Sequence, residues 1–295
     1  MAKIHRAEKI CKQLKNKLNY LEKLEVHSVF ENAVNLICKD SLVTIVPQGK
    51  PLYPNSILLA DNINFATDMK LRQGMIATVD TDNLIIAEET IGLCGAEEKE
   101  LHVDTLVLNK PRDLEKRIVV LRNIVRAKAN GEGLSPIIDA NAKQNIYSSF
   151  LKPRIEGLLS VISSENTDEV LLLTEKIAGC GIGLTPSSDD FLCGLMAVLL
   201  ADAITKNKYG STQKLTKEMA VNAIPKTGFI SGQFLRSSAE GYLSEDSLEL
   251  IAQIYSDRDL QQLEKSALNV AKFGATSGTD TLCGVILALE EINKY

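Results

Sequence analysis

The sequence is poor in the patterns that mark membrane and secreted proteins. Its apolar run at 191–201 is much shorter than the roughly 18 residues that a membrane-spanning helix needs. The first residues are rich in lysine, and no apolar segment of the signal-peptide kind follows them. We therefore expect a cytoplasmic protein.

Cysteine and histidine are too scattered to suggest a metal ribbon or a hydrolase triad. The six cysteines include no C-x-x-C pair, which argues against both a zinc ribbon and a disulfide framework. Cys193 and Cys283 lie in apolar runs, where a core role is favoured over a nucleophilic one. His5, His27 and His102 all lie in the N-terminal part, so no Ser-His-Asp arrangement is evident. The net charge of −5 argues against a general nucleic-acid binder.

The N-terminal 25 residues carry a local positive charge, with seven Lys or Arg against three Glu. Their apolar residues fall near helical spacing and predict an amphipathic helix: Ile4, Cys11, Leu14, Leu18 and Leu21. No Trp or Phe lies on its apolar side, so we expect this side to pack against protein rather than against a membrane.

Residues 26–109 read as short β-rich runs separated by turn residues. The runs are 26–30, 42–46, 57–60, 75–79, 84–87 and 105–108, with a hairpin predicted at 80–83. The connections are too short for parallel crossovers, so we expect a mostly antiparallel sheet or a small barrel.

Helical periodicity dominates after residue 111. We predict a loop at 129–133 and helices near 112–129, 142–163, 167–178, 189–206, 212–223, 231–241, 245–255, 257–273 and 280–293. The fold class is therefore α+β, with an N-terminal helix plus β-rich domain at 1–110 and a helical domain at 111–295.

Two stretches of the helical domain repeat one design. Residues 179–200 read GCGIGLTPSSDDFLCGLMAVLL, and residues 274–289 read GATSGTDTLCGVILAL. Aligning Asp190 with Asp280 gives the shared pattern S-x-x-D-x-L-C-G, in which capping residues precede a buried helix. Gly194 and Gly284 recur inside these helices at a cost of about 1 kcal/mol each, so we infer that the two helices touch and bring both loops together.

Such paired helix starts predict a site for a small anion. Backbone N–H groups at 183–188 and 277–279 would hold phosphate or carboxylate oxygens, and glycines would let the ligand approach closely. The alternative is two ordinary capped helices, although their repetition favours a ligand site. The candidate binding residues in the two loops are Gly181, Gly183, Thr185, Ser187, Ser188, Thr276, Ser277 and Gly278.

A third helix start, TGFISG at 227–232, adds Thr227 and Ser231 to the binding candidates. Lys226, Arg236 and Lys272 are near the motifs in sequence and are candidates for supplying positive charge.

The segments GCGIGLTPSSDDFLCG, TSGTDTLCG and TGFISGQFLRSSAEG resemble the family of the H subunit of oxamate carbamoyltransferase. Ser188 stands where that family usually has glycine, and Ala275 and Thr279 stand where it often has a histidine and an aromatic residue. The resemblance implies a transferase of purine-derived allantoin breakdown. It would interconvert oxalurate plus phosphate with oxamate plus carbamoyl phosphate, with other subunits of the complex as partners.

For that reaction the catalytic candidates are Asp189, Asp190 and Asp280. We expect Asp190 and Asp280 to orient amide N–H groups. An alternative role for Asp189 is to bind Mg²⁺, because hard cations favour carboxylate oxygens; beyond that we expect no cofactor. A second hypothesis is a non-catalytic, anion-binding or scaffold subunit whose partner performs the chemistry.

Overall fold

The computed structural model describes residues 3–21, 23–129, 131–139, 141–162 and 166–294. Residue 163 of a predicted helix and Asn130 of a predicted loop lie outside this range. Contacts within the chain divide it into two compact units, Met1–Leu101 and His102–Tyr295.

The first unit is a closed β-barrel with two short helices, α1 (Lys12–Leu18) and α2 (Phe65–Asp68). The sheet order is β5-β4-β3-β2-β6-β7-β8-β1-β9, and β5 also pairs with β1, which closes the barrel. The strands in the described residues are β1 (Lys3–Cys11), β2 (Leu24–Phe30), β3 (Ala33–Cys38), β4 (Ser41–Val46), β5 (Ser56–Leu59), β6 (Ile76–Asp80), β7 (Asn83–Ile86), β8 (Glu89–Gly92) and β9 (Glu97–Lys99).

The predicted N-terminal helix is wrong for residues 3–11, which form β1. His5 and Ala7 are buried whereas Ile4 and Arg6 are exposed, which is the two-residue period of a strand. The helical spacing holds only from Lys12, where α1 buries Leu14 and Leu18.

Other strands also differ from the prediction. β4 and β5 pair in parallel across the loop at 47–55, and β1 is parallel to β8 and β9. The predicted strand at 105–108 is wrong: residue 105 ends the 3-10 turn η1 (Val103–Thr105), and residues 106–108 form neither helix nor strand. The sequence pattern missed β3, in which buried Asn35 accepts a hydrogen bond from Thr44 and donates one to Ser28.

The second unit is helical, as predicted. Its described elements after η1 are α3 (Leu114–Ala129), α4 (Ser135–Ile138), α5 (Ile146–Ile162), α6 (Thr167–Ile177), α7 (Ser187–Thr205), α8 (Tyr209–Ala223), η2 (Ile224–Lys226), α9 (Phe229–Glu240), α10 (Glu245–Ile254), α11 (Leu260–Ala271) and α12 (Ser277–Ile292). None of its described helices has the length and apolar character needed to cross a bilayer.

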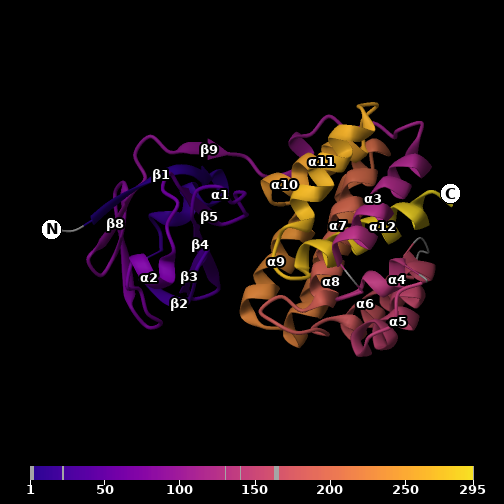
Figure 1. The fold of residues 1–295 in the computed structure, drawn as a ribbon, viewed down its shortest axis with the longest axis horizontal. Helices are drawn as coiled ribbons and strands as arrows, with labels where there is room; N and C mark the ends of the chain where they lie inside the picture. The colour runs from indigo at the N-terminus through magenta and orange to yellow at the C-terminus, as the bar shows by residue number, and fades with distance from the viewer. Residues whose placement is uncertain (1–2, 22, 130, 140, 163–165, 295) are drawn as a thin grey trace. The chain divides into compact units, whose positions relative to one another are not determined.

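The core of this unit is the pair α7 and α12, which pack closely against each other (Figure 1). A Cβ atom added at Gly194 would lie 2.1 Å from the carbonyl oxygen of Thr281, and one at Gly284 would lie 2.0 Å from that of Phe191. Only glycine fits at these two positions, because the partner backbone occupies the space. The missing side chains bring the two helices into direct backbone contact.

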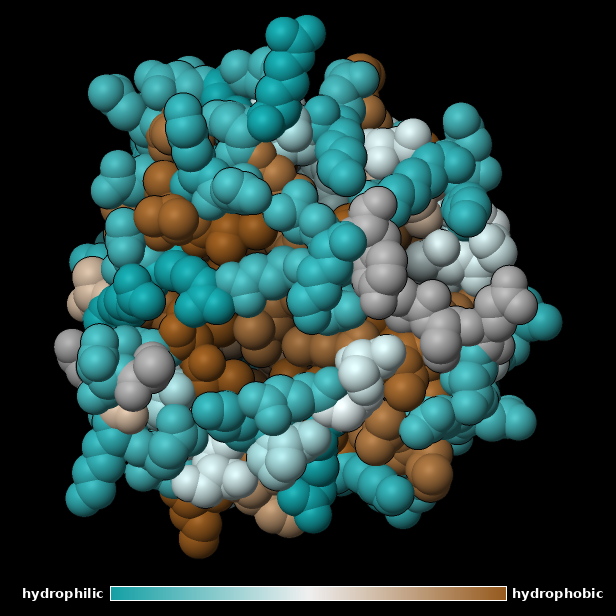
Figure 2. Space-filling model, turned by 90° about the vertical axis from the view of Figure 1, so that its right-hand side faces the viewer, coloured by the Kyte–Doolittle hydropathy of each residue, from teal (hydrophilic) through white to brown (hydrophobic). Residues whose placement is uncertain are grey.

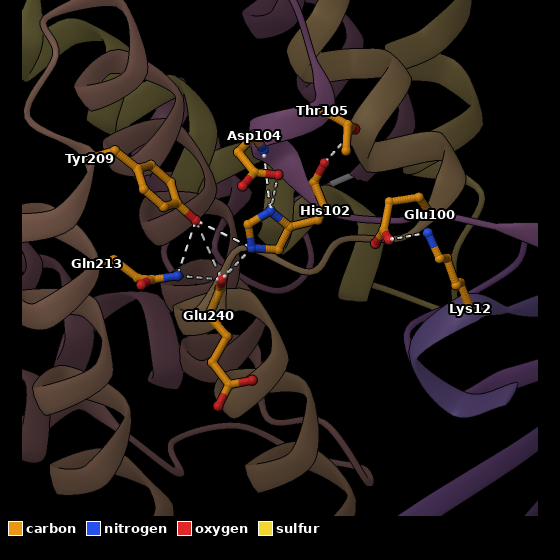
Figure 3. Close-up of polar contacts among 8 residues, drawn as sticks. All are labelled: Lys12, Glu100, His102, Asp104, Thr105, Tyr209, Gln213 and Glu240. Atoms are coloured by element: carbon orange, nitrogen blue, oxygen red, sulfur yellow. Dashed lines mark hydrogen bonds and ion pairs between the residues drawn. The ribbon is translucent and has the colours of Figure 1, made fainter. Parts of the chain in front are cut away.

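The first residues of the helical unit are anchored by a polar cluster around His102 (Figure 3). The ring contacts the carboxylate of Asp104 through Nδ1, and Nε2 lies 2.9 Å from the carbonyl oxygen of Glu240. The side-chain amide of Gln213 donates to the same carbonyl at 2.9 Å and to the Tyr209 hydroxyl at 3.1 Å. These contacts tie the segment after Leu101 to α8 and α9.

Candidate functional site

The two repeated loops meet where α7 and α12 begin. The hydroxyl oxygens of Thr185 and Ser277 are 3.0 Å apart. The serine of each repeat interacts with the aspartate of the other, Ser277 with Asp190 and Ser187 with Asp280. The repeats are thus related by a local pseudo-two-fold symmetry that places both aspartates at one end of the helix pair.

Asp190 and Asp280 are both buried, with 6% and 0% of their surface exposed. In the described structure, Oδ2 of each carboxyl group has no hydrogen-bond partner. Burial raises the pKa of Asp190 well above its ordinary value, and the nearby Asp280 charge raises it further against the opposing hydroxyls of Ser277 and Thr185. A buried acceptor without a donor is costly, so two side by side are typical of a site that a ligand completes.

Asp280 also receives a backbone donor. Burial raises its pKa, the N–H of Leu134 and the hydroxyls of Ser187 and Thr276 lower it, and the net pKa is about 6. The Leu134 N–H donates to Oδ1 at 2.7 Å. This contact leaves Oδ2 as the open oxygen.

Asp189 has a different environment, since the chain itself saturates its carboxylate. Oδ1 accepts from the Gly179 N–H at 2.7 Å and from the Ser188 hydroxyl at 3.3 Å. Oδ2 accepts from the Thr227 hydroxyl at 2.5 Å and from the Ser231 hydroxyl at 2.7 Å. Asp189 therefore ties the glycine-rich loop and the start of α9 to α7, and the hydroxyls of Thr227 and Ser231 serve this carboxylate.

The arrangement at Asp189 does not favour the Mg²⁺ alternative. A cation would have to displace four donors from a carboxylate that is 1% exposed. The described residues contain no group of three or more His, Cys, Asp or Glu side chains that could hold a metal ion.

The glycines of the loops have distinct roles. Gly181 has φ +145°, and a Cβ there would lie 2.3 Å from the Ser187 nitrogen, so the loop folds tightly over the first turn of α7. Gly278 lies against the carbonyl oxygen of Val270 in α11, 2.0 Å from the position of a Cβ, which gives it a packing role. Gly183 is exposed, has φ +92° and has open space beside it.

Many backbone donors of the predicted anion site are already used within the chain. The N–H of Ser188 donates to the carbonyl oxygen of Cys180, and the N–H groups of Asp189 and Asp190 both donate to the carbonyl oxygen of Pro186. In α12, the N–H of Gly278 donates to the carbonyl oxygen of Phe273, and the N–H of Asp280 donates to the carbonyl oxygen of Thr276. Among the partly or fully exposed residues of the first loop, 183–185 still offer their N–H groups as candidates.

The predicted positive charges are occupied elsewhere or exposed. Lys226 forms an ion pair with Glu175 at 2.8 Å, and the Lys272 ammonium donates to Asn269 at 3.1 Å. Arg236 is exposed. No described hydrogen bond or ion pair joins any of these three cations to Asp190 or Asp280.

The two repeated cysteines behave as core residues. Burial raises the pKa of the Cys193 thiol far above its usual range, and it does the same for Cys283. A thiol held neutral in this way is a poor nucleophile.

Sequence reasoning missed Gly133 and Leu134, which complete the surroundings of Asp280. They precede α4 in a segment that the sequence shows only as a loop. Gly131 of the same loop also lines a pocket of about 640 Å³. The described residues lining this pocket are Arg126, Gly131, Asp139, Ala142, Lys143, Gln144 and Asn145.

Comparison with protein families covers both units. A family described as Oxamate carbamoyltransferase subunit AllH matches residues 177–289, and the AllH family N-terminal domain matches residues 6–98. The chain belongs to this family. The AllH match contains both repeated loops and the start of α9, whereas Gly133 and Leu134 lie outside the two matched segments. Comparison with curated proteins and with solved structures found no match.

Proposed function

We propose that this chain is the subunit of an oxamate carbamoyltransferase that binds the ureido end of oxalurate. The enzyme would interconvert oxalurate plus phosphate with oxamate plus carbamoyl phosphate. The observation that carries the proposal is the pair of buried carboxyl oxygens, Oδ2 of Asp190 and of Asp280, that have no donor in the described structure. Ureido and amide groups present the N–H donors that such acceptors need.

The two buried carboxyls suit the two ends of the transfer. Burial raises the pKa of both, that of Asp280 to about 6 and that of Asp190 well above its ordinary value, so the pair is able to hold a proton beside the ligand. Asp280 would accept a hydrogen bond from an N–H group of the carbamoyl moiety. Asp190 would donate its proton to the oxamate nitrogen as the carbamoyl C–N bond breaks and phosphate oxygen bonds to the same carbon. The proton of the attacking phosphate then restores Asp190.

The phosphate would lie against the exposed glycine-rich loop. The N–H groups of residues 183–185 are close in sequence to Thr185, whose hydroxyl is in contact with Ser277 at the aspartate pair. Backbone donors of this kind bind phosphate oxygens and stabilise the charge that develops during transfer.

Single substitutions in the assembled enzyme test this proposal. Asp190→Asn and Asp280→Asn should each lower the rate of oxalurate phosphorolysis by about 10²–10⁴-fold, the usual contribution of a general acid or base. Asp202→Asn is the matched control, because Asp202 is also on α7, is 7% exposed and has an oxygen without a hydrogen-bond partner. We expect it to keep near-normal turnover. Full activity in both site variants would overturn the proposed roles.

The second candidate is a non-catalytic subunit whose partner performs the chemistry. Figure 2 shows apolar side chains reaching the surface in a band between rows of polar ones. Exposed apolar patches of this kind mark interaction surfaces, which favours assembly with other subunits. If this candidate is correct, the chain binds oxalurate while both aspartate variants retain turnover in the assembled enzyme.

A further inference from the structure

The loop between α3 and α4 meets Asp280 from outside the two repeated motifs. The Leu134 N–H lies 2.7 Å from Asp280 Oδ1. Gly133 has φ +55°, and a Cβ at that position would lie 2.2 Å from Oδ1 and 2.8 Å from Oδ2 of the same carboxyl group. Any side chain at residue 133 would therefore displace the carboxylate.

The position of this loop is itself fixed from the opposite side by Asn145. The Asn145 side-chain amide donates to the carbonyl oxygen of Gly133 at 2.8 Å and to that of Gly131 at 3.4 Å. Its Oδ1 accepts the N–H of Ser148 in the first turn of α5. The loop is thus held between the beginning of α5 and the carboxylate of Asp280.

We propose that Gly133 and Leu134 are positioning residues of the substrate site, which fix Asp280 so that only Oδ2 faces the ligand. The expected effect on turnover rests on the proposed function, whereas the positioning of Asp280 by Gly133 and Leu134 is independent of it. The Leu134 N–H occupies Oδ1 and prevents the carboxyl group from rotating. Gly133 allows this approach because it has no Cβ atom that would clash with the carboxylate. Asn145 holds both residues in place through the backbone of the loop.

The same contact tunes the proton affinity of Asp280. The Leu134 N–H favours the ionised carboxylate and lowers the pKa of Asp280 against the larger effect of burial. The other groups that face Asp280 are the hydroxyls of Ser187 and Thr276, the carboxyl of Asp190 and the buried thiol of Cys283. Removing the backbone donor should therefore make Asp280 bind its proton more tightly.

The chain offers a matched pair of glycines for the test. Gly131 also has a positive φ, +79°, but has no atom within 4 Å of an added Cβ. Gly131→Ala and Gly133→Ala thus introduce the same kind of backbone strain two residues apart, and only the second reaches Asp280. We would measure the melting temperature and the Asp280 carboxyl titration by NMR for the full chain, and turnover of the assembled enzyme as a function of pH.

We expect Gly133→Ala to lower the melting temperature more than Gly131→Ala, to raise the pKa of Asp280 and to reduce turnover by about 10-fold or more. The excess loss of melting temperature should vanish in an Asp280→Ala background, because the clash is then gone. Asn145→Asp keeps the acceptor for Ser148 but loses the donor to the loop, and it should shift the Asp280 titration in the same direction.

Equal effects of the two glycine substitutions on melting temperature and on the Asp280 titration would overturn the proposal. So would an excess loss that persists when Asp280 is replaced by alanine. Failure of the proposed function is a separate result: the Asp280 titration would still respond to Gly133→Ala, but Asp280→Asn would leave turnover unchanged.

Discussion

The two repeats are alike within the helix pair and unlike outside it. Gly194 and Gly284 make reciprocal backbone contacts, and Ser187 and Ser277 each reach the aspartate of the other helix. The next layer of contacts breaks this symmetry. Asp280 receives a backbone N–H from the loop before α4, whereas the pKa of Asp190 is lowered only by hydroxyl groups.

A second difference lies at the residue preceding each shared aspartate. Asp189 in the first repeat binds four donors from the glycine-rich loop, α7 and the start of α9. Its counterpart Thr279 donates only to the carbonyl oxygen of Thr276 within its own repeat. The comparison shows how two equivalent carboxyls acquire different surroundings: the helix pair brings them together, and their unequal neighbours then distinguish them.

The largest expected loss of stability comes from replacing Asp189, the residue at which the two repeats differ most in their contacts. Asp189→Ala leaves the Gly179 N–H and the hydroxyls of Thr227 and Ser231 without their acceptor. We expect the free energy of unfolding to fall by about 4 kcal/mol, since each unsatisfied buried donor costs about 1–3 kcal/mol. Urea unfolding followed by circular dichroism measures it. Thr279→Ala is the control and should cost about 1 kcal/mol; similar losses in both variants would contradict the asymmetry.

The symmetric part of the comparison predicts equal losses at the two glycines. Gly194→Ala and Gly284→Ala each place a Cβ 2.0–2.1 Å from a carbonyl oxygen of the other helix. Each should lower the free energy of unfolding by about 3 kcal/mol through overpacking. Gly210→Ala in α8 has no atom within 4 Å of the added Cβ. It should instead stabilise the helix by about 0.5–1 kcal/mol in the same urea measurement. A large difference between Gly194→Ala and Gly284→Ala would show that the two glycines do not make equivalent contacts where α7 and α12 cross.

The smallest expected effect is a gain in the free energy of unfolding when Asp280, whose pKa is raised, is replaced by the uncharged asparagine. The pKa of Asp280 is raised from 3.8 to about 6 in the folded chain, so the folded state binds the proton more tightly. Stability from this group is therefore present at acidic pH and is lost as pH rises from about 4 through about 6, at a cost near 3 kcal/mol above that window. Asp280→Asn should recover about 1–2 kcal/mol above the window, because its amide is still buried.

Unfolding measured at pH values on both sides of the window checks this prediction. The gain from Asp280→Asn should shrink toward zero at the acidic end, where the aspartate is protonated in both states. A gain that does not depend on pH would show that Asp280 titrates at its ordinary value.

The helical unit was largely predictable because its chemistry is local. The repeated S-x-x-D-x-L-C-G pattern predicts two capped, buried helices whose glycines point to close contact. The burial and the close contact are confirmed, but the capping is wrong, because neither N-cap residue, Pro186 or Thr276, makes a side-chain capping hydrogen bond. The barrel was harder to predict, because Ile4 and Cys11 of β1 continue the helical spacing of Leu14 and Leu18, although Ile4 is exposed. A nine-residue loop joining two parallel strands, β4 and β5, is an exception that strand patterns do not reveal.

The roles of the site residues depended on contacts that sequence spacing does not encode. Asp189 and Asp190 are adjacent and identical in type, yet one is saturated by distant hydroxyls and the other has an open oxygen. The Gly133–Leu134 contact to Asp280 spans 146 residues and was invisible for the same reason. A glycine with positive φ in a short loop before a helix is the only local signal there, and it also fits an ordinary turn.

The most direct test of the central claim is an NMR titration of the carboxyl carbons of Asp190 and Asp280, with and without saturating oxalurate. The account predicts a pKa near 6 for Asp280, a pKa well above the ordinary value for Asp190, and a shift of both when oxalurate binds. Two aspartates that titrate at ordinary values and do not respond to bound oxalurate would contradict it.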